Sequence, residues 1–241
     1  MERKKYLILM AGGSGTRMGA PIPKQFLELG GRAILHATLE RFCSAIPDIK
    51  VVTVLPEAHI PFWRHYCAER NVLVPQVLVT GGITRFHSVR NGLGKVPEGA
   101  VVAIHDGVRP LVSEDLIRTM FDMAREKPAV IPVIPSIDTV RALENKTMPD
   151  GSSELSPIPG VYPDRNILFR VQTPQVFRSE DIRAAYTQAY SQSFTDDASV
   201  AEKYGIPLSF VQGERMNIKI TSREDLILAQ AILEVLQRSH S

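Results

Sequence analysis

Short apolar runs that alternate with stretches of helical periodicity constrain the fold of this chain more than any other feature. The apolar runs occupy residues 5–11, 50–55, 75–80, 100–105 and 129–137, and they are rich in Val, Ile and Leu. Stretches with helical spacing lie between them at 33–45, 57–71, 83–96 and 113–127, and Ser113 is placed to cap the last of these. Such strands, separated by helices of this length, are typical of a parallel sheet covered on both faces.

The alternation stops at about residue 138. From there to about residue 164 the chain is rich in Pro, Gly and Ser, and the turn signal MPDGSS predicts a projecting hairpin between two extended pieces. Beyond it we expect two helices, short strands at 207–213 and 216–220, and a final helix that Ser222 and Asp225 open with the spacing of a capping box. We therefore predict an α/β fold in one domain over residues 1–241. It has a Rossmann-like, mostly parallel sheet, helices on both faces and a projecting β-arm at about 138–165.

Composition excludes several classes of protein. The formal net charge is +2 and the chain has no basic run that could follow a nucleic-acid backbone. Its two cysteines, Cys43 and Cys67, lack the spacing of a metal site or a disulfide framework, which favours a reducing cytosol. The first apolar run is too short for a signal peptide or a membrane span. We expect a cytoplasmic protein without nucleic-acid or membrane partners.

A glycine-rich loop, AGGSGTRMG, follows the first predicted strand and continues to PKQF. It carries Arg17 and Lys24 and no acidic residue. Glycines let backbone N–H groups approach an anion, and cations add charge at the same place. The loop therefore predicts a phosphate site, although exposed charges would be the ordinary reading of either cation alone.

Two familiar glycine motifs do not fit this loop. The chain contains no G-x-x-x-x-G-K-[ST] string. A dinucleotide fingerprint begins at Gly13 and Gly15, but Met18 stands where its third glycine belongs, and Pro21 and Pro23 delay the helix. Hydride transfer from a nicotinamide is therefore disfavoured.

Further candidates follow the other predicted strands, whose carboxyl ends share one edge of a parallel sheet. Asp106 in HDGVRP is a candidate Mg²⁺ ligand, or else a residue of an Asx turn, and Arg109 could grip a phosphate bidentately. We interpret His105 as a structural residue. No Ser-His-Asp or Cys-His pattern is present, which indicates chemistry that needs no side-chain base.

Several strings occur in a fixed order along nearly the whole chain: MAGGSGTRMG, PKQF, HDGVRP, DTV, DRN, VQTPQVF, TDDAS and GERMNIKIT. The first also opens many sugar nucleotidyltransferases, whereas the ordered set resembles the polyol-phosphate cytidylyltransferases. Within these it is similar to the 2-C-methyl-D-erythritol 4-phosphate cytidylyltransferase family of the nonmevalonate isoprenoid route. The resemblance implies a homodimeric enzyme that transfers CMP from CTP to that polyol phosphate, with Mg²⁺ or another divalent cation, and releases pyrophosphate.

The resemblance also implies roles for individual residues. Arg17 and Lys24 would be catalytic, gripping the triphosphate and stabilising the transition state, and Asp106 would support the metal. The nucleotide would contact three loops, through Ala11, Gly12, Gly13, Gly15, Gly81, Gly82, Ser88 and Asp106. The acceptor would be positioned by Arg109, Thr139, Arg165 and Lys219. By the same analogy the arm would reach the neighbouring subunit, so that Thr139 and Arg165 serve the partner's site.

The chemistry of this reaction agrees with the residues. Its nucleophile is a phosphate monoester oxygen, which is anionic near neutral pH, so that positioning and electrostatic stabilisation suffice without a base. Three features depart from the family pattern: Gly12 replaces a common Ala, Ile83 replaces a common acid, and the arm is longer than usual. The alternatives are a ribitol-5-phosphate cytidylyltransferase, a nucleotide-binding module without turnover, and a nicotinamide oxidoreductase.

Overall fold

The computed structural model describes residues 3–12 and 22–238. In this part of the chain eight strands form one sheet in the order β10-β7-β11-β6-β1-β4-β5, with β12 also paired to β7. The strands are β1 (Lys5–Met10), β4 (Lys50–Leu55), β5 (Gln76–Thr80), β6 (Val101–Asp106), β7 (Ala129–Pro135), β10 (Phe169–Val171), β11 (Gln175–Arg178) and β12 (Leu208–Gln212).

Most of the sheet is parallel. Strand β1 pairs in parallel with β4 and β6, β4 with β5, and β12 with β7, whereas β10 and β11 run antiparallel to their neighbours. The mostly parallel sheet predicted from the sequence is thus confirmed.

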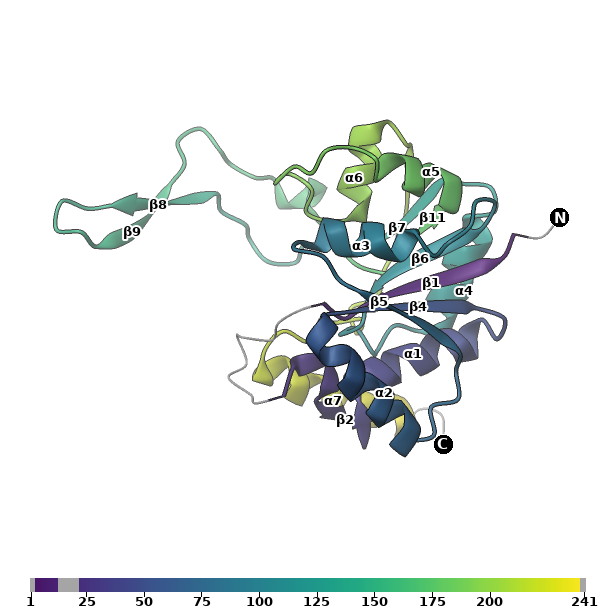
Figure 1. Cartoon of the computed structure of the whole chain (residues 1–241). Helices are drawn as coiled ribbons and strands as arrows, with labels where there is room; N and C mark the ends of the chain where they lie inside the picture. Colours follow the sequence, from purple (N-terminus) through teal and green to yellow (C-terminus); the bar gives the residue numbers. More distant parts are fainter. Residues whose placement is uncertain (1–2, 13–21, 239–241) are drawn as a thin grey trace.

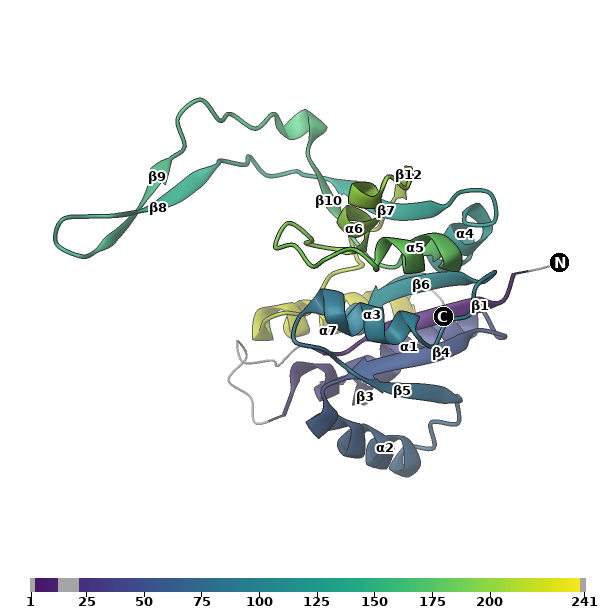
Figure 2. The ribbon, with the colours of Figure 1, turned by 45° about the horizontal axis from the view of Figure 1, so that its top comes forward.

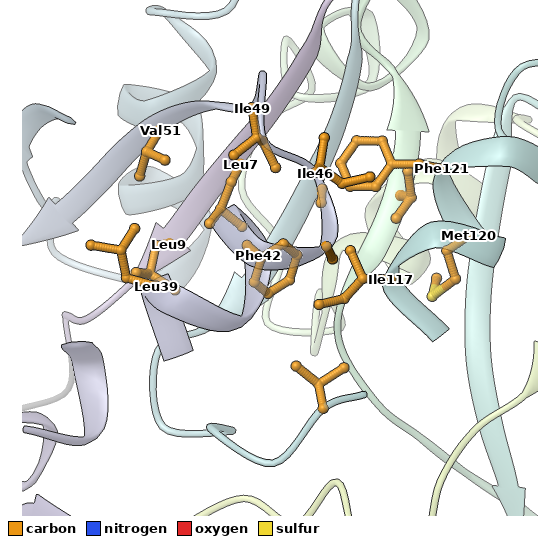
Figure 3. Close-up of a cluster of buried hydrophobic side chains, with 14 of the residues drawn as sticks. Leu7, Leu9, Leu39, Phe42, Ile46, Ile49, Val51, Ile117, Met120 and Phe121 are labelled. Atoms are coloured by element: carbon orange, nitrogen blue, oxygen red, sulfur yellow. The ribbon is translucent and has the colours of Figure 1, made fainter. Parts of the chain in front are cut away.

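Helices cover both faces of the sheet (Figure 1). Leu7 and Leu9 of β1 pack on one face with α1 (Ile34–Ala45), α2 (Ile60–Glu69) and α4 (Glu114–Met123), as Figure 3 shows for part of this cluster. The alternate residues Ile8 and Met10 pack on the other face with α3 (Arg85–Leu93), α5 (Ser179–Ala185) and α6 (Asp197–Tyr204). Because successive side chains of a strand point to opposite faces, a continuous apolar run is what such a two-sided core requires.

The closing helix α7 (Arg223–Arg238) packs on a small hairpin of β2 (Glu28–Leu29) and β3 (Arg32–Ala33) through Leu29 and Ala229. Its predicted capping box is present, since the Ser222 hydroxyl accepts from the Asp225 N–H at 3.2 Å and the carboxylate accepts from the Ser222 N–H at 2.9 Å. Short 3₁₀ helices occur at η2 (Lys24–Phe26), η3 (Glu57–His59) and η4 (Arg165–Ile167).

The predicted hairpin projects from the body of the molecule in two views (Figures 1 and 2). It consists of β8 (Leu143–Thr147) and β9 (Ser153–Pro157), joined by a turn in which Gly151 adopts a φ of 82°. Leu155 is 63% exposed and Tyr162 is 82% exposed. The arm therefore leaves apolar side chains exposed to solvent.

The strand predicted at 216–220 is wrong, because these residues form no regular secondary structure. Burial does not follow the apolar alternation of MNIKI: Asn217 and Ile220 are fully buried, whereas Met216 is exposed. The Ile220 N–H bonds to the Val108 carbonyl at 2.9 Å rather than to a neighbouring strand. Within the described residues no helix has the length and apolar character needed to cross a membrane.

Candidate active site

The carboxyl ends of three strands meet at one edge of the sheet. Met10 at the end of β1 is level with Asp106 at the end of β6, and with Val54 of β4. The ladder continues one residue further, since the Ala11 N–H bonds to the Val54 carbonyl and the Gly81 N–H to the Leu55 carbonyl. The loops that follow β1, β5 and β6 are therefore held side by side, as expected for a ligand site in an open parallel sheet.

A cavity of about 380 Å³ opens between these loops. It gathers residues that the sequence predicted for the nucleotide, the catalytic step and the acceptor, namely Ala11, Gly12, Lys24, Gly82, Ser88, Asp106 and Lys219. A second cavity of about 280 Å³ shares Arg85, Asp106 and Lys219 with the first and adds Arg109. The two cavities thus meet at a single charged boundary.

Asp106 is the centre of that boundary. Its carboxylate lies 2.8 Å from Lys219 Nζ, 3.6 Å from Arg109 Nε and 3.9 Å from Arg85 Nε. Burial alone would raise the pKa of this carboxyl group, but Arg85, Lys219 and Arg109 outweigh it and hold the pKa well below its ordinary value. Asp106 is therefore ionised at neutral pH, and the surrounding cations exceed it in charge.

Lys219 reaches this centre from an irregular segment that buried hydrogen bonds hold in place. Arg109 Nη1 donates to the Asn217 carbonyl at 2.8 Å, and Gln172 Nε2 donates to the Glu214 carbonyl at 2.8 Å. Asn217 Nδ2 in turn donates to the Thr173 carbonyl at 2.9 Å. These bonds replace the sheet ladder that a strand would have supplied.

His105 is a structural residue, as the sequence suggested. It is fully buried, with Nδ1 3.1 Å from the Thr173 hydroxyl and Nε2 3.1 Å from the Arg109 carbonyl. Burial lowers its pKa to about 3, so the ring is neutral. It braces the loop that carries Asp106 and Arg109.

The backbone N–H groups at the cavity rim are partly used within the protein. That of Ala11 continues the strand ladder, and the Gly82 N–H donates to the Ser88 hydroxyl at 2.9 Å. The N–H of Gly81, which lines neither cavity, also continues the ladder. A Cβ at Gly82 would lie 2.4 Å from the Cβ of His87, so this position requires glycine for close packing. Ala11 and Gly82 therefore shape the rim more than they supply free donors.

Lys24 is carried on η2, which neighbouring residues fix. Gln25 Nε2 donates to the Ala11 carbonyl at 3.0 Å, and the Phe26 ring packs on Phe62 with centroids 4.6 Å apart. Ile83 is 92% exposed on the rim of the larger of these two cavities.

Other predicted residues lie elsewhere. Gly13, Gly15 and Arg17 lie outside the described residues. Thr139 and Arg165 are at the two ends of the arm, both exposed, and line neither cavity. Within the described residues, Thr139 and Arg165 therefore do not lie at the site that this chain forms.

Sequence reasoning missed Arg85 as a site residue, although it lines both cavities. The available signal was its position in TGGITRFHS, a glycine-containing loop after a strand. Its partner Asp197 lies 112 residues away, so periodicity could not have linked the two.

The donor set of the site restricts which metal it could hold. Among the described residues no group of three or more His, Cys, Asp or Glu side chains gathers to form a metal centre. Asp106 offers a single carboxylate, which suits Mg²⁺ because this ion is often held by one or two carboxylates together with substrate phosphates.

A third cavity, of about 830 Å³, lies between α4 and α7. It contains none of the predicted site residues.

Comparison with known proteins agrees with this geometry. Residues 6–235 match the family model described as "IspD: 2-C-methyl-D-erythritol 4-phosphate cytidylyltransferase". Curated relatives of that name include one from Bacteroides fragilis, 45% identical over 226 residues that cover 94% of this chain and 98% of the relative. Another from Porphyromonas gingivalis is 45% identical over 234 residues, covering 97% and 99%.

A solved structure shows the same fold. The 4-diphosphocytidyl-2C-methyl-D-erythritol synthase of Anaerococcus prevotii superimposes with a TM-score of 0.75 at 29% identity, covering 96% of this chain and 99% of that one. The match of the family model and the near-complete coverage of the relatives agree with the ordered motifs and with the cavity at the strand ends. The chain belongs to the 2-C-methyl-D-erythritol 4-phosphate cytidylyltransferase family.

Proposed function

We propose that this chain transfers CMP from CTP to 2-C-methyl-D-erythritol 4-phosphate and releases pyrophosphate. The observation that carries the proposal is the pair of adjoining cavities whose boundary holds Arg85, Asp106 and Lys219. A reaction that joins two phosphorylated substrates needs two anion sites that meet, and cations where they meet.

In this proposal the nucleotide occupies the larger of the two adjoining cavities, beside Lys24 and Ser88. The acceptor phosphate enters the smaller of the two, beside Arg109 and Lys219. An acceptor phosphate oxygen attacks the α-phosphorus of CTP, a new P–O bond forms, and the bond to the β-phosphate oxygen breaks. The electron pair leaves with pyrophosphate. Lys24 and Lys219 stabilise the negative charge that develops, and no side chain has to accept a proton.

We further propose that Mg²⁺, or a similar divalent cation, binds with CTP at Asp106. The ionised carboxylate fits this role, and the metal would supply charge neutralisation of the phosphates. Lys219 Nζ lies 2.8 Å from the same carboxylate in the structure, so it can neutralise the negative charge of Asp106 before the substrates bind.

We also propose a homodimer formed through the arm, acting in the cytoplasm. The exposed apolar side chains of the arm support the dimer, because a single subunit leaves them in water. Thr139 and Arg165 would then complete the partner's acceptor site, which agrees with their absence from the lining of either cavity in their own chain.

The proposed location in the cytoplasm is supported by the two cysteines. Cys43 and Cys67 are both free thiols, which agrees with a reducing compartment.

The test is pyrophosphate release from CTP by the purified chain, with and without methylerythritol phosphate. Release that requires both the acceptor and Mg²⁺, and stops when a chelator is added, supports the proposal. Steady release without any acceptor would instead indicate hydrolysis of CTP, and no release by folded protein would reject turnover.

A further inference from the structure

A fully buried carboxylate, Asp197, lies in the first turn of α6 and faces the N-terminus of α3. Arg85 donates to both of its oxygens, with Nη1–Oδ1 at 2.7 Å and Nη2–Oδ2 at 2.6 Å. The Tyr186 hydroxyl donates to Oδ1 at 2.6 Å. Asp197 is thus fixed from two directions, by Arg85, which is 112 residues away in the sequence, and by Tyr186, which is 11 residues away.

Arg85, which is paired with Asp197, also faces the candidate active site. It lines both cavities, its side chain is 32% exposed, and its Nε lies 3.9 Å from Asp106, too far for a hydrogen bond. A guanidinium has five N–H donors, of which the pair with Asp197 uses two among the described residues. Donors of Arg85 therefore remain for a ligand at the boundary of the cavities.

We call the arrangement in which Tyr186 and Asp197 hold the Arg85 guanidinium the clamp. The protonation states of Arg85 and Tyr186 favour its permanent presence. Burial opposes the positive charge of Arg85, but Asp197 more than offsets it and raises the Arg85 pKa. Burial, together with the neighbouring Asp197, raises the pKa of Tyr186 well above its ordinary value, so its hydroxyl stays protonated and keeps donating.

Stability alone is a weak reason for such an arrangement. A buried ion pair is often no more stabilising than well-packed apolar residues of the same volume, because both charges lose their hydration. What the pair does supply is a fixed guanidinium orientation, and arginine recognises phosphate through the fixed geometry of its donors.

We propose that Asp197, held by Tyr186, is a positioning residue that acts through Arg85: it fixes the guanidinium at the boundary of the two cavities, where Arg85 binds the phosphate groups being joined. The role of the clamp in turnover rests on the proposed function, whereas its role in binding a polyanion does not. An error of about 1 Å in such positioning can cost about 10² in rate.

The test uses Asp197→Asn, Tyr186→Phe, Arg85→Lys and their pairwise combinations. We expect Asp197→Asn and Arg85→Lys each to lower kcat at least tenfold and Tyr186→Phe to lower it about threefold. The KM for CTP should change less than threefold, because the base and sugar also hold the nucleotide. If Asp197 acts through Arg85, the double variant should fall no further than the worse single variant.

A matched control is Arg3→Gln, which breaks a half-buried ion pair with Glu180 at 2.6 Å, away from both cavities. It should lower the thermal midpoint without changing kcat. A purely structural role for Asp197 predicts this same pattern, and kcat within twofold of wild type in folded Asp197→Asn would overturn the proposal. If Asp197→Asn does not fold, the test is the Tyr186→Phe, Arg85→Lys double variant. A decrease in its kcat equal to the product of the two single decreases would also overturn the proposal.

Binding of inorganic pyrophosphate, measured by calorimetry without acceptor or turnover, separates this proposal from the proposed function. We expect Asp197→Asn to bind pyrophosphate at least fivefold more weakly than wild type and Arg3→Gln to bind it equally well. If these binding differences are found but the wild-type chain never releases pyrophosphate from CTP, the proposed function is rejected and the clamp is retained. Equal binding by wild type and Asp197→Asn would reject the clamp.

Discussion

Lys24 is the residue of the described site whose role can be tested most directly. It lines the larger of the two adjoining cavities on η2, a segment held by Gln25 and Phe26. We expect Lys24→Ala to lower kcat by about 10²–10³, because it removes charge from the transition state, and to leave the chain folded, because Gln25 and Phe26 still hold η2. Steady-state kinetics and thermal denaturation check this.

Lys50→Ala serves as the control, since Lys50 is an exposed lysine at the opposite end of the central strands and should leave kcat unchanged. A Lys24→Ala enzyme with nearly normal turnover would contradict the catalytic assignment.

At this same scale, the sequence predicted the residues that lie in strand-end loops and missed their partners. Lys24, Asp106 and Arg109 could be found because the loops of a parallel sheet share one edge, whereas Lys219 was expected only from the family resemblance. The pairing of Arg85 with Asp197 depends on how α3 and α6 pack, which no local pattern encodes.

Among the elements, the start of α7 gives a prediction about pH. Burial would raise the pKa of Asp225, but hydrogen bonds from Thr221 and Ser222 outweigh it and lower the pKa. A lowered folded-state pKa contributes stability above the unfolded-state pKa of about 3.9, and this stability is lost as pH falls through the folded-state value. Asp225→Asn should therefore lower Tm at pH 7 and have little effect near pH 2.

The expected change at pH 7 is small, about 1–3 °C, because water screens a partly exposed carboxylate. Thermal denaturation of both proteins across this pH range checks it, with Glu234→Gln, near the other end of α7, as a control. An equal loss of Tm at both pH values would contradict the charge-based explanation.

Element by element, long periodic runs were predicted well, and short irregular pieces were not. Strands β1, β4, β5, β6, β7 and β12 of the main sheet and helix α7 follow from apolar periodicity and capping signals, whereas the short antiparallel strands β10 and β11 were not predicted. The strand predicted at 216–220 was wrong because the apolar alternation there does not match burial: the loop buries Asn217 and Ile220 and exposes Met216. The two-residue strands β2 and β3 are too short to show any period.

For the whole molecule, the proposed dimer predicts complementation between two inactive variants. If Arg165 serves the partner's site, a heterodimer of Lys24→Ala and Arg165→Ala chains has one complete site. Mixing equal amounts after dissociation should recover about one quarter of the wild-type rate, since half the dimers are mixed and each has one intact site. Turnover and sedimentation of the mixture check this.

The corresponding control is a chain that carries both substitutions, mixed with wild type, which forms no intact site in its heterodimers. If Arg165 acts within its own subunit, the mixture of single variants stays inactive.

The acceptor is the central claim at this scale, because CTP-dependent chemistry and the α/β fold would suit either polyol phosphate. The direct measurement is kcat/KM for pyrophosphate release from CTP with methylerythritol phosphate and with ribitol 5-phosphate, on the same preparation. We predict efficient release with methylerythritol phosphate and at least 10²-fold lower kcat/KM with ribitol 5-phosphate, as a pocket that pairs with specific hydroxyl groups discriminates strongly. Preference for ribitol 5-phosphate would contradict the account and assign the same chemistry to another acceptor.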